Sequence, residues 1–192
     1  MGKNIKKLLI IFLTLISLSG CVKKKAKVPQ SNNQPLLKKF TIDYIGSNKE
    51  ISIIGSKAMA ENTNQTSVSN PNLAISTKNI VVRISTTSNG QGQIFLNPKT
   101  QQPDRIIIQG DRVTINQENL KTKNMNFTAF CKKLTYIKSS SLLILDGNPE
   151  IFQGQNKYQA NRISYDINNN KITFEGNVKI FYVEKSSGSI RK

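Results

Sequence analysis

Beyond residue 40 the chain consists of short runs rich in Ile, Val, Phe and Tyr, separated by clusters of Asn, Gly, Ser and Lys. Each run has the usual length of a β-strand, and the clusters at 88–90, 146–148, 168–170 and 175–177 have the composition of turns. After the first twenty residues, no long window keeps the 3.6-residue period of a helix. The pattern predicts an all-β fold with strands over 40–45, 51–54, 80–85, 93–96, 105–109, 112–115, 133–137, 141–145, 150–153, 162–165, 171–175 and 178–183.

Residues 57–79 carry a weaker pattern. The stretch over 62–72 is polar, which fits either a long loop or a frayed strand at a sheet edge.

Hydrophobic alternation is clearest in the last predicted strands. Ile172 and Phe174 fall on one face of their strand, and Ile163 and Tyr165 on one face of theirs. In the final run, Val178, Ile180 and Tyr182 oppose Lys179, Phe181 and Val183. One apolar and one mixed face are typical of an antiparallel sheet with one side in water.

Two segments of the second half repeat each other at an offset of 29 residues, which separates Tyr136 from Tyr165 and Gly147 from Gly176. A weaker copy covers 105–115. Each unit contains two strands, a Gly-Asn kink and a further strand, and glycine permits a bend that a side chain would block. Repetition at fixed spacing predicts strand pairs stacked into a curved, layered sheet.

The N-terminus has the three-part build of a secretory signal peptide. Three lysines precede an apolar run over 8–18, and the sequence closes on Leu-Ser-Gly-Cys at residues 18–21, which resembles a bacterial lipobox. The resemblance implies that Cys21 carries a diacylglycerol and begins the mature protein. An uncleaved membrane helix would need about 20 apolar residues, more than this run offers. A plain signal peptide followed by an ordinary thiol is the other alternative.

These features divide the chain into four parts. Residues 1–20 are the predicted signal peptide, and 21–38 are the lipidated cysteine with a flexible, basic tether. Residues 39–184 form the β domain, and 185–192 are a polar tail. Tether lysines beside the bilayer would attract anionic head groups.

The net charge is +17, and removal of the signal peptide with its three lysines leaves +14. Such an excess suits a polyanionic partner: nucleic acid, an anionic lipid head group or a phosphorylated glycolipid. A secreted chain favours the lipids, and no basic-aromatic RNA-binding motif is present. Lysines that only solvate the surface are the simpler alternative.

The chain lacks the parts of common active sites. It contains no histidine, and its 11 acids are scattered, so histidine-based triads and metal sites are excluded and no acid–base pair stands out. With Cys21 lipidated, Cys131 is the one remaining thiol, and a small buried residue is its expected role. We therefore expect no catalytic residues, no metal, no cofactor and no enzymatic activity.

The segments over 158–166 and 171–180, with a small residue at Ala160, a Tyr-Asp turn at 165–166 and Gly-Asn-Val at 176–178, resemble the repeat of the OstA/LptA/LptC family of lipopolysaccharide transport. The likeness covers about 105–183 and is thin over 40–100. It implies an open antiparallel sandwich, like a β-jellyroll, that shelters acyl chains between its sheets and joins neighbours by strand edges.

An N-terminal anchor points to an LptC-type member. LptC proteins usually carry a transmembrane helix, whereas this sequence indicates a lipid, and Val22 replaces the Asp that retains many enterobacterial lipoproteins at the inner membrane. The resemblance to LptC implies a periplasmic protein that is lipid-anchored to the inner membrane, and the absence of Asp at position 22 leaves the outer membrane as the alternative.

The expected function is to receive lipopolysaccharide and pass it toward the outer membrane within a transport bridge. The partners implied are lipopolysaccharide, an inner-membrane ABC transporter and other bridge proteins joined by edge pairing, and the membrane itself; nucleic acid is not expected. The residues expected to line the lipid groove are Ile106, Ile108, Leu143, Leu145, Ile163, Tyr165, Ile172, Phe174, Val178 and Ile180. Arg105, Arg112 and Arg162 are candidates for lipid phosphates.

A second hypothesis comes from a different class of protein. A structural or adhesive envelope lipoprotein would use the same repeats to build a packed β-sandwich or β-solenoid, and its apolar residues would only pack against one another.

Overall fold

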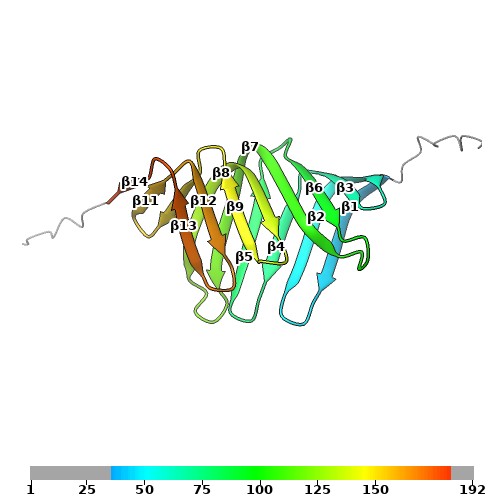
Figure 1. The fold of residues 1–192 in the computed structure, drawn as a ribbon, viewed down its shortest axis with the longest axis horizontal. Coiled ribbons are helices and arrows are strands. Elements are labelled where there is room, and N and C mark those ends of the chain that lie inside the picture. Colours follow the sequence, from blue (N-terminus) through cyan, green and yellow to red (C-terminus); the bar gives the residue numbers. More distant parts are fainter. Residues whose placement is uncertain (1–35, 183–192) are drawn as a thin grey trace, which may run out of the picture. The chain divides into compact units, whose positions relative to one another are not determined.

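The computed structural model describes residues 36–182, and every regular element within them is a strand, as predicted (Figure 1). The predicted signal peptide, Cys21, the tether up to residue 35 and the polar tail lie outside the described residues. The strands are β1 (Leu36–Ile45), β2 (Glu50–Asn62), β3 (Gln65–Ser69), β4 (Asn72–Ser76), β5 (Ile80–Thr86), β6 (Gln91–Leu96), β7 (Pro103–Asn119), β8 (Met125–Ile137), β9 (Leu142–Asp146), β10 (Glu150–Gln153), β11 (Asn156–Gln159), β12 (Arg162–Asp166), β13 (Lys171–Glu175) and β14 (Lys179–Phe181).

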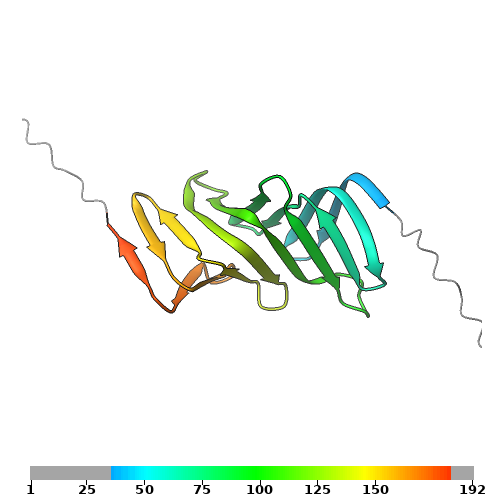
Figure 2. The ribbon, with the colours of Figure 1, turned by 90° about the horizontal axis from the view of Figure 1, so that it is seen from above.

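The strands belong to one hydrogen-bonded sheet, and three long strands, β2, β7 and β8, fold it into two layers. β7 pairs with β6 through its first half and with β5 through its second. β8 divides its length between β9 and β10, and β2 between β3 and β4. Layer A therefore holds β3, β6, β9, β12 and β13, and layer B holds β4, β5, β10, β11 and β14. The strands follow one another along the long axis in chain order (Figure 2).

The long strands change layer at bends. In β7 the bend is a bulge, because residues 110–112 stand opposite the single residue Lys132 of β8; extra residues in one strand bend and twist it locally. In β2 the bend is at Gly55, where an added Cβ would lie 2.6 Å from Val68 and 2.8 Å from Phe40. Glycine is needed there because two side chains occupy the space.

The Gly-Asn pairs of the repeat carry the chain from layer A to layer B. Gly147 and Asn148 have φ values of 81° and 58°, and Gly176 and Asn177 have 66° and 46°. Glycine and asparagine tolerate this left-handed region better than other residues. Each 29-residue unit is thus a hairpin of layer A followed by a crossing into layer B.

All such crossings lie on the side of the bends, which we call the bend side. They join β3 to β4, β5 to β6, β9 to β10, β11 to β12 and β13 to β14. On the opposite side, the open side, each turn of the described chain stays within one layer. The two layers are consequently connected by the chain along the bend side and are not connected by it along the open side, within the described residues.

Strand register aligns the inward-facing side chains in four rows. In layer A, the row near the open side consists of Ile94, Ile106, Tyr136, Leu143, Tyr165 and Ile172. The layer A row near the bends consists of Val68, Ile108, Leu134, Leu145, Ile163 and Phe174. In layer B, the row near the open side consists of Tyr44, Ile51, Ile75, Val82, Gln117 and Phe127. The layer B row near the bends consists of Ile42, Ile53, Leu73, Ile84, Ile115, Ala129, Ile151, Tyr158 and Ile180. These rows form most of the buried core.

The structure adds β4, β11 and the first half of β8 to the predicted strands, and it corrects three further details. The polar stretch over 62–72 is neither a long loop nor an edge: it contains the whole of β3, which pairs with β2 on one side and β6 on the other. The runs at 105–109 and 112–115 are halves of one strand, β7. β1 begins at Leu36, so the last residues assigned to the tether pair with β2.

Candidate functional site

The facing inner surfaces of the two layers form the candidate site, which we call the trough. Six of the ten predicted lining residues lie in its middle and are at most 2% exposed: Ile106, Ile108, Leu143, Leu145, Ile163 and Tyr165. All six belong to the two rows of layer A, so the structure brings them together on one face. In the middle of the trough the two layers pack directly against each other, as in Phe127 of layer B against Tyr165 of layer A, with ring centroids 5.0 Å apart.

The other four predicted residues lie at the C-terminal end of the trough. Ile172 and Phe174 on β13 are partly buried against the core. Val178 and Ile180 are 47% and 46% exposed. Ile180 still continues a row of layer B, because it pairs with Tyr158. The trough therefore ends in apolar side chains that the described chain covers only in part.

Sequence reasoning missed the inner face of layer B. Ile51, Ile53, Leu73, Ile75 and Ile84 are almost fully buried there. The family resemblance was thin in this half of the chain, and the strands fall outside the repeat. The alternation of Ile51 with Ile53, and of Leu73 with Ile75, was the signal that could have identified them.

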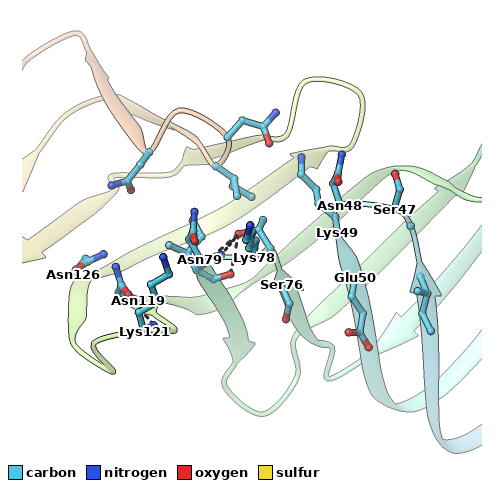
Figure 3. Close-up of a pocket in the computed structure, with 17 residues that line it drawn as sticks. Ser47, Asn48, Lys49, Glu50, Ser76, Lys78, Asn79, Asn119, Lys121 and Asn126 are labelled. Carbon is cyan, nitrogen blue, oxygen red and sulfur yellow. Dashed lines mark hydrogen bonds between the residues drawn. The ribbon is translucent and has the colours of Figure 1, made fainter.

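A hollow of about 920 Å³ opens on the open side of the trough (Figure 3). Turns of layer B supply most of its wall: 46–49 between β1 and β2, 77–79 between β4 and β5, and the start of the β7–β8 turn. The β12–β13 turn of layer A contributes Ile167, Asn168 and Asn170. Ile80 and Ile167 are buried in the core as well, so the hollow meets the apolar interior.

The rim of this hollow is basic. Its charged residues are Lys49, Lys78, Lys121 and a single acid, Glu50. Partial burial lowers the pKa of Lys49, and the negative charge of Asp166 acts in the opposite direction. Hydrogen bonds from Asn169 and Asn168 lower the pKa of Asp166, which favours its charged form. An anionic group placed over an apolar interior would be attracted here.

The three predicted phosphate-binding arginines have other contacts. The guanidinium of Arg105 lies 4.3 Å from the ring centre of Phe95, and that of Arg112 lies 3.7 Å from the ring centre of Phe130. Arg162 donates a 2.8 Å hydrogen bond from Nε to Asp146. Arg105 and Arg162 alternate with inward-facing Ile106 and Ile163, so these two lie on the outer face of layer A.

Cys131 lies at the bend of β8 and is buried, as predicted. Burial, together with the charge of Asp146, raises the pKa of its thiol to about 12, so the nucleophilic thiolate is scarce at neutral pH. Within residues 36–182, no three Cys, Asp or Glu side chains gather as a metal site requires. The same residues include no helix with the length and apolar character needed to cross a membrane.

The fold and the trough define a layered, open β-jellyroll with an apolar interior. The model of the family described as LptA/(LptD N-terminal domain) LPS transport protein matches residues 72–171, from β4 to the start of β13. This is more than half of the chain, and the protein belongs to that family, which confirms the superfamily identified from the repeat.

A solved structure has the same fold. It is LptH of Pseudomonas aeruginosa, described as the LptA homologous periplasmic component of the conserved lipopolysaccharide transport device. The match has a TM-score of 0.54 at 9% identity and covers 70% of this chain and 95% of that one. No curated protein matches this sequence significantly.

Proposed function

We propose that the protein is a membrane-anchored periplasmic carrier that receives lipopolysaccharide and passes it toward the outer membrane as one module of a transport bridge. Membership of the LPS transport family supports the cargo. The function requires no catalytic group, because each buried CH₂ contributes about 0.8 kcal/mol to binding. A few acyl chains in the trough are enough for useful affinity.

The continuity of the inner rows is the observation that carries this proposal. The row through Leu134, Leu145 and Ile163 reaches partly buried Phe174, and the row through Ile115 and Ile151 reaches exposed Ile180. An apolar chain could move from one end to the other without leaving an apolar surface. The basic rim would hold anionic head groups on the open side.

Entry of a lipid requires the layers to part. The middle of the trough is filled by side chains with almost no exposure, such as Leu134 and Tyr136. The layers are joined by covalent crossings on the bend side, so separation at the open side would break side-chain contacts and leave strand pairing intact. Acyl chains would replace the lost contacts.

The partners would bind at the strand edges. β13 pairs with β12, and β14 with β11, and each has one free edge within the described chain. Free edges accept added strands. We propose that the inner-membrane ABC transporter and other bridge proteins pair there, and that Cys21 anchors the protein by lipid to the inner membrane in preference to the outer one, in an LptC-like role.

Site-specific photo-crosslinking in cells tests this proposal. A crosslinker at Phe174 or Ile180 should capture lipopolysaccharide. The matched controls are Thr173 and Lys179, which neighbour these residues and point to the other face. Depletion of the protein should also reduce lipopolysaccharide at the cell surface.

The structural hypothesis has one observation in its favour, the filled middle of the trough. If crosslinks from Phe174 and Ile180 reach only protein, and depletion leaves surface lipopolysaccharide unchanged, the protein is an envelope scaffold and transport is excluded.

A further inference from the structure

Gln117 is a polar residue in an apolar row. It lies on β7 between Val82 of β5 and Phe127 of β8, in the layer B row nearest the open side. Its side chain is 0% exposed. The other members of the row are aliphatic or aromatic.

Among residues 36–182, neither polar atom of the Gln117 amide has a hydrogen-bond partner. Buried amide groups are nearly always paired, because leaving them unpaired is costly. The adjacent Asn116 differs: it faces outward, is only partly buried, and its Oδ1 accepts a 2.9 Å hydrogen bond from the hydroxyl of Thr128. The hydroxyl of Tyr136, in the row of layer A nearest the open side, is likewise buried and has no partner in the described part of the chain.

Gln117 also lies close to the hollow. Asn119, two residues further along β7 and on the same face of the strand, lines the hollow, as does Asn126, which precedes Phe127. Two residues of a strand span about 7 Å. From the rim toward the bends, the site therefore presents lysines, then an unpaired amide, then aliphatic rows.

This order matches the order of groups in an acylated anionic lipid: a charged head, a polar linkage and apolar tails. A side-chain amide offers two N–H donors and a carbonyl acceptor. Its Nε2 can donate to the carbonyl of an ester or amide linkage, and its Oε1 can accept from a hydroxyl or an N–H near that linkage. The hydroxyl of Tyr136 adds a donor from the opposite layer.

We propose that Gln117 recognises the ester or amide linkage that joins acyl chains to the head group of a lipid bound in the trough. The inference rests on the proposed function and adds a determinant of specificity. Gln117 distinguishes lipids with carbonyl linkages from apolar chains of equal length, since a buried amide left unpaired by its ligand penalises the wrong ligand.

The test compares two probes with the detergent-purified full chain. One is a diester phosphatidic acid, and the other is its diether analogue with the same phosphate and chain lengths but no carbonyl groups. Wild-type protein should bind the diester about tenfold more tightly. In Gln117→Leu the two affinities should become equal, whereas the control Asn116→Leu should keep the preference.

Thermal unfolding of the same variants separates a structural role from recognition. Gln117→Leu removes an unpaired buried amide, so it should unfold at the same or a higher temperature, and a change in lipid preference cannot then come from misfolding. Equal binding of both probes by the wild type, or a preference that survives in Gln117→Leu, overturns the inference while leaving lipid carriage intact. Failure of the wild type to bind either probe would contradict both the inference and the proposed function.

Discussion

The middle and the C-terminal end of the trough share the same rows and differ in what covers them. Leu134 and Ile163 are 0% exposed, whereas Ile180 is 46% exposed. In the middle, each side chain has strand neighbours on both sides and a second layer opposite. At the end, β13 and β14 each have a strand neighbour on one side only, as far as the described residues go, and the same pattern of side chains is partly exposed there.

The comparison shows that one alternating apolar pattern can stabilise the fold in one region and offer a surface for binding in another. An apolar residue stabilises the fold where its own chain covers it, and offers surface where the chain stops. At the C-terminal end, the exposed large apolar residues are Val178, Ile180, Phe181 and Tyr182. Ile180 continues an inward row of layer B, and Phe181 lies on the other face of the same strand. The following predictions test this division between middle and end, in order of decreasing effect.

Thiol labelling should give the largest difference. Protein carrying Cys21→Ser leaves Cys131, buried at the bend with its pKa raised to about 12. At pH 8 its thiolate is about a thousandfold scarcer than that of a thiol with an ordinary pKa. Iodoacetamide should react at least that much faster with a cysteine placed at Ile180 in a Cys131→Ser background. Similar rates would mean that the middle opens readily.

The next largest difference between middle and end should come from the truncation of a core residue. Leu134→Ala should lower the free energy of unfolding by about 2–5 kcal/mol, because it leaves a cavity between packed layers. Ile180→Ala should lower it by less than about 1 kcal/mol, since the side chain is already half in water. Urea denaturation measures both. Equal losses would show that the end is as closely packed as the middle.

The contact between the two layers at the C-terminal end should contribute less to stability than the packing in the middle of the trough. Phe174 of β13 stacks on Tyr158 of β11, with ring centroids 5.5 Å apart. Phe174→Ala should destabilise the protein by about 1–2 kcal/mol, the value of an aromatic pair with partial burial. Hydrogen exchange should quicken in β13 and β14 and stay unchanged in β7. The control Thr173→Ala on the outer face should leave exchange unaltered.

The smallest effect should be a pH dependence at the same end. Lys157, and to a lesser extent Gln159, lower the pKa of Glu150. The pair with Lys157, at 2.9 Å, is partly exposed, so it contributes about 0.2–1 kcal/mol. This stability is present above the ordinary glutamate pKa and is lost as pH falls through the lowered value. The difference in unfolding free energy between wild type and Glu150→Gln should vanish at acid pH; a constant difference would contradict the pairing.

Part of the site could be predicted from the sequence. The repeat and the alternation in the second half identified the inward face of layer A, including Ile163 and Tyr165. They failed for the N-terminal half of layer B, which lies outside the repeat and where β2 and β7 each pair with strands of both layers. No local pattern marks a strand that changes partner at Gly55 or at the bulge after Gln109, because pairing partners lie far away along the chain.

The basic rim was missed for the same reason. Lys49, Lys78 and Lys121 lie in three separate turns, and only the stacking of layer B brings them to one hollow. Conversely, Arg105 and Arg162 have the right charge and lie on the outer face.

The sequence by itself determined the strand class, the Gly-Asn crossings and the inward parity of the repeat, since these depend on local φ preferences and a two-residue period. Only the tertiary structure decided which apolar residues are covered, which lysines converge and that Gln117 is buried with no partner in the described chain. These properties depend on which strand lies opposite, and that is fixed by long-range pairing.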